Sequence, residues 1–201
     1  MGTLPITAWV QERIRQLMPH PLICLDATAG RGKDTLFLCE ITPPEGLVYA
    51  MDIQESALEQ ARERIEKAGY GSKVRFIADG HEHMDRHVSG NIDLIMFNLG
   101  YLPGGDHGIS TAFPTTGEAV LKGLSLLRPG GLMTLVIYSG GDSGYDERDA
   151  LIPFLKEVDS HQFTVILESF HNRPGSVPLP VYILKHRDRE DKHNKNRGEG
   201  Q

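Results

Sequence analysis

The chain is poor in cysteine, has no long apolar run and carries fewer positive than negative charges. The spacing of its two cysteines, Cys24 and Cys39, suits neither a redox motif nor a metal site, so we expect core packing in a reducing cytoplasm. No apolar run approaches the roughly 20 residues that a membrane-spanning helix needs, and we expect no membrane partner. A net charge of −6, from 21 Lys and Arg against 27 Asp and Glu, argues against indiscriminate nucleic-acid binding but leaves a local basic patch open.

What remains is the composition of an ordinary globular domain. Hydrophobic residues make up 39% of the chain and charged residues 24%, and 201 residues suffice for one domain with a full core. Residues 1–18 alternate apolar and charged side chains, which predicts an amphipathic helix rather than a secretion signal. Residues 186–201 contain no apolar side chain, so we predict one domain over 1–185 followed by a disordered, charged tail.

Strand and helix patterns alternate along most of the chain. We predict strands at 22–25, 47–52, 73–79, 92–98 and 132–138, with helices at 33–40, 56–67, 81–88, 116–127 and 147–158. An Arg-Pro-Gly-Gly sequence at 128–131 is expected to close the helix before the fifth strand. Two last apolar runs, 163–170 and 180–185, have no helix between them and are expected to pair antiparallel. The pattern predicts an α/β fold with a mostly parallel sheet, helices on both faces and a C-terminal antiparallel pair.

A glycine-rich turn follows the first predicted strand. Asp26 precedes Gly30 and Gly32, and Thr35 stands where a dinucleotide-binding turn would have its third glycine. A carboxylate at a strand end can accept hydrogen bonds from the ammonium group of a ligand. The pattern D-x-x-x-G-x-G resembles the first motif of class I S-adenosylmethionine-dependent methyltransferases, although similar turns also occur without any ligand.

The second predicted strand ends in Asp52, 22 positions after Gly30. A carboxylate at this position can accept hydrogen bonds from both hydroxyls of a ribose, and the spacing from the turn favours that interpretation. The alternative is that Asp52 is the N-cap of the next helix, a position that prefers the same residue type. Gln54 is a further candidate contact for the adenosine.

Asp79, Gly80 and His81 stand at the end of the third predicted strand. In class I methyltransferases this corner usually contacts the adenine ring, but a turn and a helix cap explain the same residues equally well. His83 and His87 share a helix face and raise the question of a metal site. No cysteine or paired carboxylate stands at ligand spacing, so we expect no metal.

The fourth predicted strand ends abruptly at Asn98, followed by Leu99, Gly100, Tyr101, Leu102 and Pro103. An amide side chain and a free carbonyl at a strand end can hold the hydrogens of an amine and aim its lone pair at a methyl donor. The segment resembles the N-P-P-Y loop of methyltransferases that act on amino groups, with Asn98 and Tyr101 at the matching ends. An ordinary Asn-x-Gly turn is the alternative.

Taken together, these motifs resemble one family. Residues 26–35 (DATAGRGKDT), 51–56 (MDIQES) and 97–106 (FNLGYLPGGD) are similar to the "putative rRNA methylase" family, which includes the tRNA 5-(aminomethyl)-2-thiouridine methyltransferase. The likeness extends nearly to Lys185 and takes in the pair Thr115 and Thr116 and the residues Asn172, Pro178 and Pro180. It implies a Rossmann-like class I sheet, S-adenosylmethionine as cofactor, a tRNA partner and methylation of the primary amine of that uridine at the wobble position.

The resemblance and the strand-end chemistry together give the expected site. Cofactor-binding residues are expected at Asp26, Thr28, Gly30, Arg31, Gly32, Asp34, Thr35, Asp52, Ile53, Gln54, Gly80, His81 and Asn98. Residues expected to act on the substrate are Asn98, Leu99, Tyr101 and Asp106, with His107 a second candidate base. Candidate phosphate contacts are Arg31, Lys33 and Arg173, and the apolar final strands are the expected interface of a homodimer.

The chain departs from the family after the fifth strand. The family tends to show Y-x-G-H there, whereas this chain has Tyr138, Ser139, Gly140 and Gly141. Methylation of rRNA or of another amino group stays open as an alternative. Two other classes of function also stay open, a nucleotide-dependent oxidoreductase and a non-catalytic nucleotide- or RNA-binding module.

Overall fold

The computed structural model describes residues 4–100, 111–138, 142–173 and 177–187, with the backbone alone for 142–146. The strands are β1 (Ile23–Asp26), β2 (Leu47–Asp52), β3 (Val74–Ala78), β4 (Ile92–Leu99), β5 (Leu127–Ile137), β6 (Phe163–Leu167) and β7 (Leu179–Lys185). The helices are α1 (Ile6–Leu17), α2 (Lys33–Ile41), α3 (Glu55–Lys67), α4 (Met84–His87), α5 (Phe113–Leu126) and α6 (Asp142–Lys156). Short 3₁₀ turns lie at Gly71–Lys73 and His81–His83.

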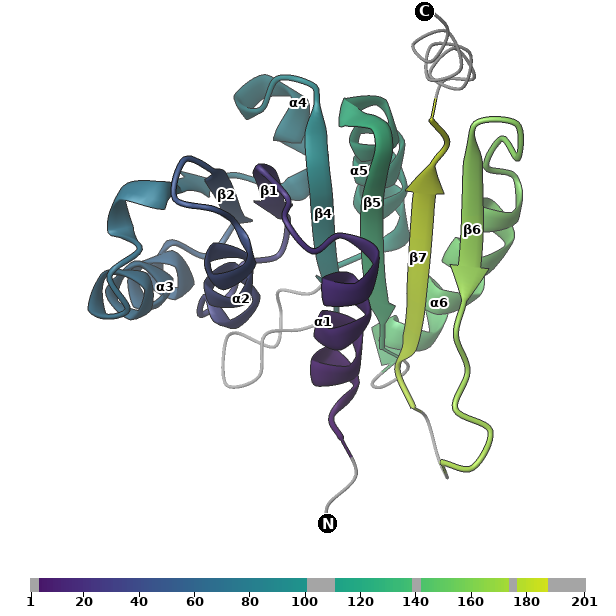
Figure 1. Ribbon diagram of the computed structural model, residues 1–201. Helices are drawn as coiled ribbons and strands as arrows, with labels where there is room; N and C mark the ends of the chain where they lie inside the picture. The colour runs from purple at the N-terminus through teal and green to yellow at the C-terminus, as the bar shows by residue number, and fades with distance from the viewer. Residues whose placement is uncertain (1–3, 101–110, 139–141, 174–176, 188–201) are drawn as a thin grey trace, which may run out of the picture.

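One seven-stranded sheet has the order β3-β2-β1-β4-β5-β7-β6. Strands β1 to β5 pair in parallel, whereas β7 runs antiparallel to both of its neighbours, β5 and β6. Helices α1, α2 and α3 cover one face, and α5 and α6 cover the other (Figure 1). The predicted α/β fold, with its mostly parallel sheet and C-terminal antiparallel pair, is confirmed.

Each face of the sheet has its own hydrophobic core. On the side of α1 and α2, Val10 and Ile14 pack with Cys24 and Leu94. On the side of α4 to α6, Leu25 packs with a larger set that includes Phe97, Met133 and Leu151. Strands that are buried on both faces need nearly continuous apolar sequence, which explains why 92–97 contains a single charged residue, Asp93.

Cys24 and Cys39 are both buried free thiols, as expected. Burial raises the pKa of Cys24 to about 12 and that of Cys39 to about 11, so both stay protonated and act as core packing residues. None of the helices in the described ranges has the length and apolar character that crossing a membrane requires.

The amphipathic helix expected at the N-terminus is α1, and Glu168 ties it to the antiparallel end of the sheet. The Glu168 carboxylate accepts hydrogen bonds from Trp9 Nε1 at 2.6 Å, Arg13 at 3.0 Å and the Tyr182 hydroxyl at 3.0 Å. Because Glu168 follows β6 and Tyr182 lies in β7, this network fixes α1 across the last two strands. The position of α1 matters for the site, since one of its side chains reaches it.

Several predicted boundaries are wrong. Helix α5 begins at Phe113 rather than at 116, because Pro114 fits the first helical turn, where its missing N–H costs little. Strand β5 begins at Leu127 and contains the residues 128–131 that were expected to form a turn. There Ile92 pairs with Leu127 and Leu94 with Leu132, so the extra residues of β5 form an irregularity in the ladder. Helix α6 starts at 142 and β6 stops at 167, against predictions of 147 and 170.

Strand register brings three polar side chains to one end of the sheet. Asp26 aligns with Ala50 of β2 and with Met96 of β4. Asp52 and Asn98 therefore lie two residues beyond Asp26 along their own strands, and side chains two apart share a face. The turn that follows Asp26 consequently lies between Asp52 and Asn98.

Candidate active site

The turn from β1 to α2 is held by backbone hydrogen bonds on both sides. Ala27 N–H donates to Met96 O at 2.9 Å, and Ala29 N–H donates to Met51 O at 2.8 Å. Gly30 and Gly32 have φ of 48° and 75°, the left-handed region that favours glycine. A Cβ on Gly32 would lie 2.9 Å from Cα of Ala61, so the close approach required at Gly32 is to helix α3.

Asp26 lies inside this turn and is completely buried. Its Oδ2 accepts a hydrogen bond from the Thr35 hydroxyl at 2.6 Å, and Thr28 N–H approaches Oδ1 at 3.4 Å. Burial raises the pKa of Asp26 to about 7, and the negative charge of Asp34 adds to the shift. The buried hydrogen bond between Thr35 and Asp26 thus connects the start of α2 to the end of β1. Asp34, next to Thr35, is only partly buried.

Asp52 fastens the same turn from the next strand. Its Oδ2 accepts the Gly30 N–H at 2.8 Å, and its Oδ1 accepts the Gln54 N–H at 2.9 Å. The N-cap of α3 is Gln54, so the alternative that Asp52 caps this helix is wrong. Each carboxylate oxygen retains a lone pair, and the predicted contact with a ribose is compatible with this geometry. Ile53 beside it is 56% exposed.

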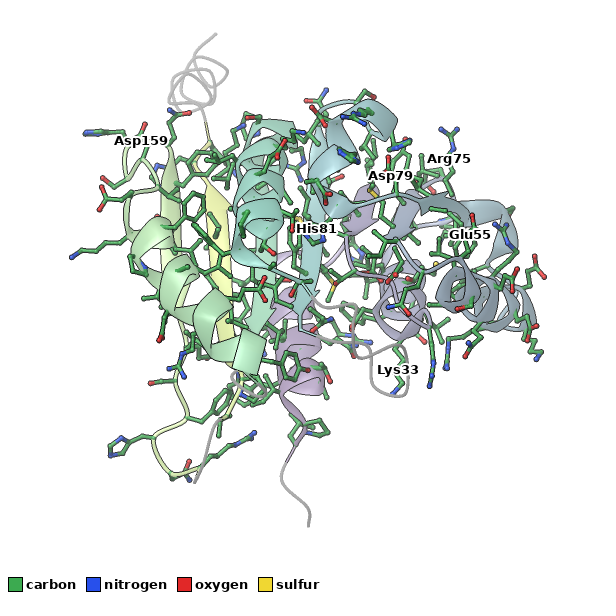
Figure 2. All side chains as sticks on the ribbon, turned by 180° about the vertical axis from the view of Figure 1, so that it is seen from behind. Lys33, Glu55, Arg75, Asp79, His81 and Asp159 are labelled. Carbon is green, nitrogen blue, oxygen red and sulfur yellow. The ribbon has the colours of Figure 1, made fainter. Side chains whose placement is uncertain are left out.

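The corner after β3 is organised by Asp79 (Figure 2). Its Oδ1 accepts the Gly80 N–H at 2.8 Å and contacts His83 Nδ1 at 2.7 Å, while its Oδ2 contacts His87 Nε2 at 2.7 Å. Hydrogen bonds from His87 and His83 hold the pKa of Asp79 well below its usual range. Both histidines are therefore bound to one carboxylate, and the described ranges contain no group of three or more His, Cys, Asp or Glu arranged to hold a metal ion.

His81, in contrast, has an unpartnered nitrogen. Its Nε2 is buried without a hydrogen bond, and its ring meets Phe97 edge-on with centroids 5.9 Å apart. Burial lowers the pKa of His81, so the ring is neutral near pH 7. The free nitrogen of a neutral imidazole can form a hydrogen bond with a polar group of a ligand. The contact of His81 with adenine stays a prediction.

Asn98 at the end of β4 is held through two of its atoms. Its backbone N–H donates to Thr28 Oγ1 at 2.7 Å, and its Nδ2 donates to Asp34 Oδ2 at 2.6 Å. Its Oδ1 is buried and has no partner. Leu99 is buried, so only its backbone is left for the predicted contact with the substrate. Tyr101, Asp106 and His107 lie outside the described residues.

The N-terminal helix contributes a residue that the sequence analysis missed. Gln11 Nε2 donates to Asp34 Oδ1 at 2.7 Å, across 23 positions of the chain. Gln11 lies three residues before Ile14 on a helix whose apolar stripe identifies only the buried face. No local signal distinguishes Gln11 from the other polar residues of that helix.

A second set of contacts that the sequence analysis missed is made by Gly100 and Thr111. Thr111 N–H donates to Gly100 O at 3.1 Å, and Gly100 N–H donates to Thr111 Oγ1 at 2.7 Å. The hydroxyls of Thr111 and Thr116 both donate to the buried carboxylate of Glu147, each at 2.6 Å. These bonds connect Gly100, directly after β4, with α5 and α6.

Tyr138, directly after β5, was not among the expected site residues. A Cβ on Gly100 would lie 3.6 Å from Cβ of Tyr138, so this ring borders the Asn98 corner, and the residue is 39% exposed. Burial raises the pKa of its hydroxyl, and the charge of Asp34 adds to the shift. Its place at the carboxyl end of a central strand was the available signal.

The charge of this site selects the kind of ligand it can hold. Carboxylates of Asp26, Asp34 and Asp52 surround the turn, which disfavours the pyrophosphate of a dinucleotide and favours a cation. The unpartnered, buried nitrogen of His81 provides a further polar contact. These residues fit S-adenosylmethionine, which carries a sulfonium and an ammonium group beside its adenosine.

Fold and site together define a class I methyltransferase. The structure superposes on the crystal structure of a "putative rRNA-methylase" from Clostridium thermocellum with a TM-score of 0.87, at 36% identity over 92% of this chain and 100% of that one. A "putative methyltransferase" from Streptococcus mutans, crystallised in complex with SAH, gives a TM-score of 0.80 at 36% identity, covering 92% and 99% of the two chains. S-adenosylmethionine is accordingly the cofactor.

Residues 48–184 match the family model described as "Putative rRNA methylase", and the chain belongs to this family. It is also 34% identical over 172 residues to the chloroplastic tRNA (mnm(5)s(2)U34)-methyltransferase of Arabidopsis thaliana. That match covers 80% of this chain and 62% of the plant protein, so the chain spans less than two thirds of the length of this relative.

Proposed function

We propose that this protein transfers a methyl group from S-adenosylmethionine to the primary amine of 5-aminomethyl-2-thiouridine at the wobble position of tRNA. The observation that carries the proposal is the buried, unpartnered Oδ1 of Asn98 at the carboxyl end of β4. The similarity to a relative whose name gives this activity supports the choice of substrate.

Transfer to nitrogen requires a neutral amine held in line with the methyl donor. S-adenosylmethionine supplies the methyl group, whose bond to sulfur breaks as the bond to nitrogen forms. Asn98 Oδ1 and the Leu99 carbonyl would accept the two amine hydrogens and so direct the lone pair at the methyl carbon. An alkyl ammonium must first lose a proton, for which Asp106 and His107 are the proposed acceptors.

A second candidate function is methylation of an amino group in rRNA, which the description of the family favours. The same Asn98 corner would serve any primary or exocyclic amine, since its geometry selects the acceptor atom rather than the RNA. The two candidate functions differ in the nucleoside that receives the methyl group.

The experiment supplies S-adenosylmethionine with a deuterated methyl group to the purified protein, together with rRNA or with tRNA that already carries 5-aminomethyl-2-thiouridine at the wobble position. After digestion, nucleoside mass spectrometry identifies the product. The proposal expects deuterium in 5-methylaminomethyl-2-thiouridine alone. Label in an rRNA nucleoside, or on an oxygen or carbon, contradicts it, and NAD in place of S-adenosylmethionine serves as the negative control.

Binding of tRNA by a protein of net charge −6 would need a local basic surface. Lys33 at the first position of α2 is exposed and carries the proposal best (Figure 2). Arg173 stacks over Phe170 at 4.4 Å and donates to Leu4 O, and Arg31 is partly buried, so both have structural contacts. In a salt series, the logarithm of the tRNA affinity should fall less steeply with the logarithm of the salt concentration for Lys33→Ala than for Lys67→Ala on α3. Equal slopes would show that Lys33 does not contact the phosphates of tRNA.

We also propose a homodimer through the last strands. Strand β6 forms one edge of the sheet, and its Ile166 and Leu167 are 46% and 43% exposed. An apolar edge strand readily pairs with a second copy. Light scattering of the wild type and of Ile166→Lys should give dimer and monomer masses respectively, whereas a monomeric wild type contradicts this interface.

A further inference from the structure

Asp34 lies between two amide side chains from different elements. Gln11 of α1 donates to its Oδ1 at 2.7 Å, and Asn98 of β4 donates to its Oδ2 at 2.6 Å. Asp34 itself is the second residue of α2, where the helix N-terminus favours a negative charge. The three side chains form one continuous hydrogen-bonded chain from the N-terminal helix to the Asn98 corner.

The chemistry of these groups fixes which way each amide faces. An ionised carboxylate only accepts hydrogen bonds, so Asn98 has to present its nitrogen to Asp34. The amide oxygen of Asn98 then faces away from Asp34, and that oxygen is the buried atom without a partner. If a neutral amide replaced Asp34, either end of Asn98 could face it, and the orientation of Asn98 would no longer be determined.

We propose that Asp34 is a positioning residue for methyl transfer, which, held in place by Gln11, keeps the amide oxygen of Asn98 turned toward the acceptor amine. The inference rests on the proposed function for its substrate and assigns to Asp34 and Gln11 a role that acts through Asn98. A direct role of Asp34 in binding the cofactor is the competing assignment, and the two differ in the step that each affects.

The surroundings of Asp34 show why Gln11 is needed. Burial raises the pKa of Asp34, whereas the hydrogen bonds from Gln11 and Asn98 oppose that shift. Asp26 of β1 and Tyr138 after β5 face the same group, and neither neutralises its charge. The two amide donors and the charge of Lys33 therefore favour the ionised, acceptor-only form of Asp34.

Kinetics separate positioning from cofactor binding. Asp34→Asn keeps the size of the side chain and removes its charge, so single-turnover methyl transfer should fall at least roughly thirtyfold while affinity for S-adenosylmethionine, measured by calorimetry, stays within about threefold. Asp34→Glu should recover part of the rate. Gln11→Ala should show a smaller loss of the same kind, about three- to tenfold, because one of the two donors remains with Asp34.

Matched controls lie on the same helices. Gln16→Ala on α1 and Glu40→Gln on α2 alter exposed residues and should leave rate and affinity unchanged. Thermal unfolding of every variant identifies losses that come from misfolding. An Asp34→Asn protein that folds and keeps its rate overturns the proposal, and so does one whose affinity for S-adenosylmethionine falls as much as its rate.

A measurement without RNA separates this proposal from the proposed function. The side-chain ¹⁵N–¹H signals of Asn98, assigned through their loss in Asn98→Ala, report the hydrogen bond to Asp34 directly. They should exchange slowly with solvent in the wild type and faster in Asp34→Asn and Gln11→Ala. If the wild type methylates no RNA, the proposed function fails while these signals still decide whether Asp34 fixes the amide. Unchanged exchange in Asp34→Asn overturns the proposal.

Discussion

The amide nitrogen of Asn98 donates to the carboxylate of Asp34 over 2.6 Å, and the amide oxygen of Asn98 is left buried without a partner. These two facts are linked, because a carboxylate cannot donate and so determines which end of the amide it receives. The pairing converts a strand-end asparagine into an oriented acceptor. An amine is the group whose hydrogens such an acceptor would hold.

Asp52→Ala should weaken binding of S-adenosylmethionine. The variant removes a charged acceptor at the end of β2 and also frees the Gly30 and Gln54 N–H groups that Asp52 binds. A charge-assisted hydrogen bond contributes about 1.5–3 kcal/mol, so affinity measured by calorimetry should fall roughly ten- to hundredfold. Glu55→Ala, an exposed neighbour, is the control. Unchanged affinity in a folded Asp52→Ala protein would remove Asp52 from the cofactor site.

Asp26 should make the stability of the protein depend on pH. Because burial raises the pKa of Asp26 from 3.8 to about 7, the folded protein retains a proton that the unfolded chain releases between about pH 4 and 7. The free energy of unfolding therefore falls as pH rises through this window. Asp26→Asn cannot titrate, so it should lose less of this free energy between pH 5 and 8 than the wild type does.

Urea denaturation at pH 5 and 8 measures this difference. Glu40→Gln, which alters an exposed carboxylate on α2, should follow the wild type at both pH values. Parallel losses of stability in Asp26→Asn and the wild type would show that Asp26 titrates at its ordinary pKa in the folded protein.

Thr111→Val tests the hydrogen bonds that the Thr111 hydroxyl makes with Gly100 and Glu147. The substitution leaves the Gly100 N–H and one oxygen of Glu147 without their partner, which should cost about 1–3 kcal/mol of unfolding free energy. Turnover should fall, because Tyr101 and Asp106 lie between Gly100 and Thr111, while affinity for S-adenosylmethionine should persist. Thr115→Val, whose hydroxyl bond to Ala112 O is exposed, is the control. Full turnover in Thr111→Val would show that these hydrogen bonds do not contribute to catalysis.

The fold could be predicted because its signals are local and periodic. β2 is found at its predicted bounds, 47–52, and Cys24 and Leu94 are buried as their apolar strands require. The prediction for residues 128–131 was wrong, because a proline followed by two glycines is typical of a turn, whereas these residues belong to β5, which pairs with β4. The start of β5 is therefore set by pairing between strands and not by local sequence.

The grouping of polar side chains was predictable only near the ends of strands. Asp52 and Asn98 were predicted as site residues for this reason, and register explains why they share a face with Asp26, while their binding roles stay predictions. Gln11 and Glu147 could not be found, because each reaches the site through the packing of a helix distant in sequence. The burial of Asp26 beneath Thr35 likewise depends on how α2 packs against the turn.

The most direct test of the account compares Asn98→Ala with the wild type in two assays. Single-turnover methyl transfer to tRNA that carries 5-aminomethyl-2-thiouridine should fall at least roughly a hundredfold, since the variant removes the acceptor that orients the amine. Affinity for S-adenosylmethionine, measured by calorimetry on the same protein, should stay within about threefold. A folded Asn98→Ala protein that methylates tRNA at nearly the wild-type rate would contradict the account and show that the corner after β4 is only a turn.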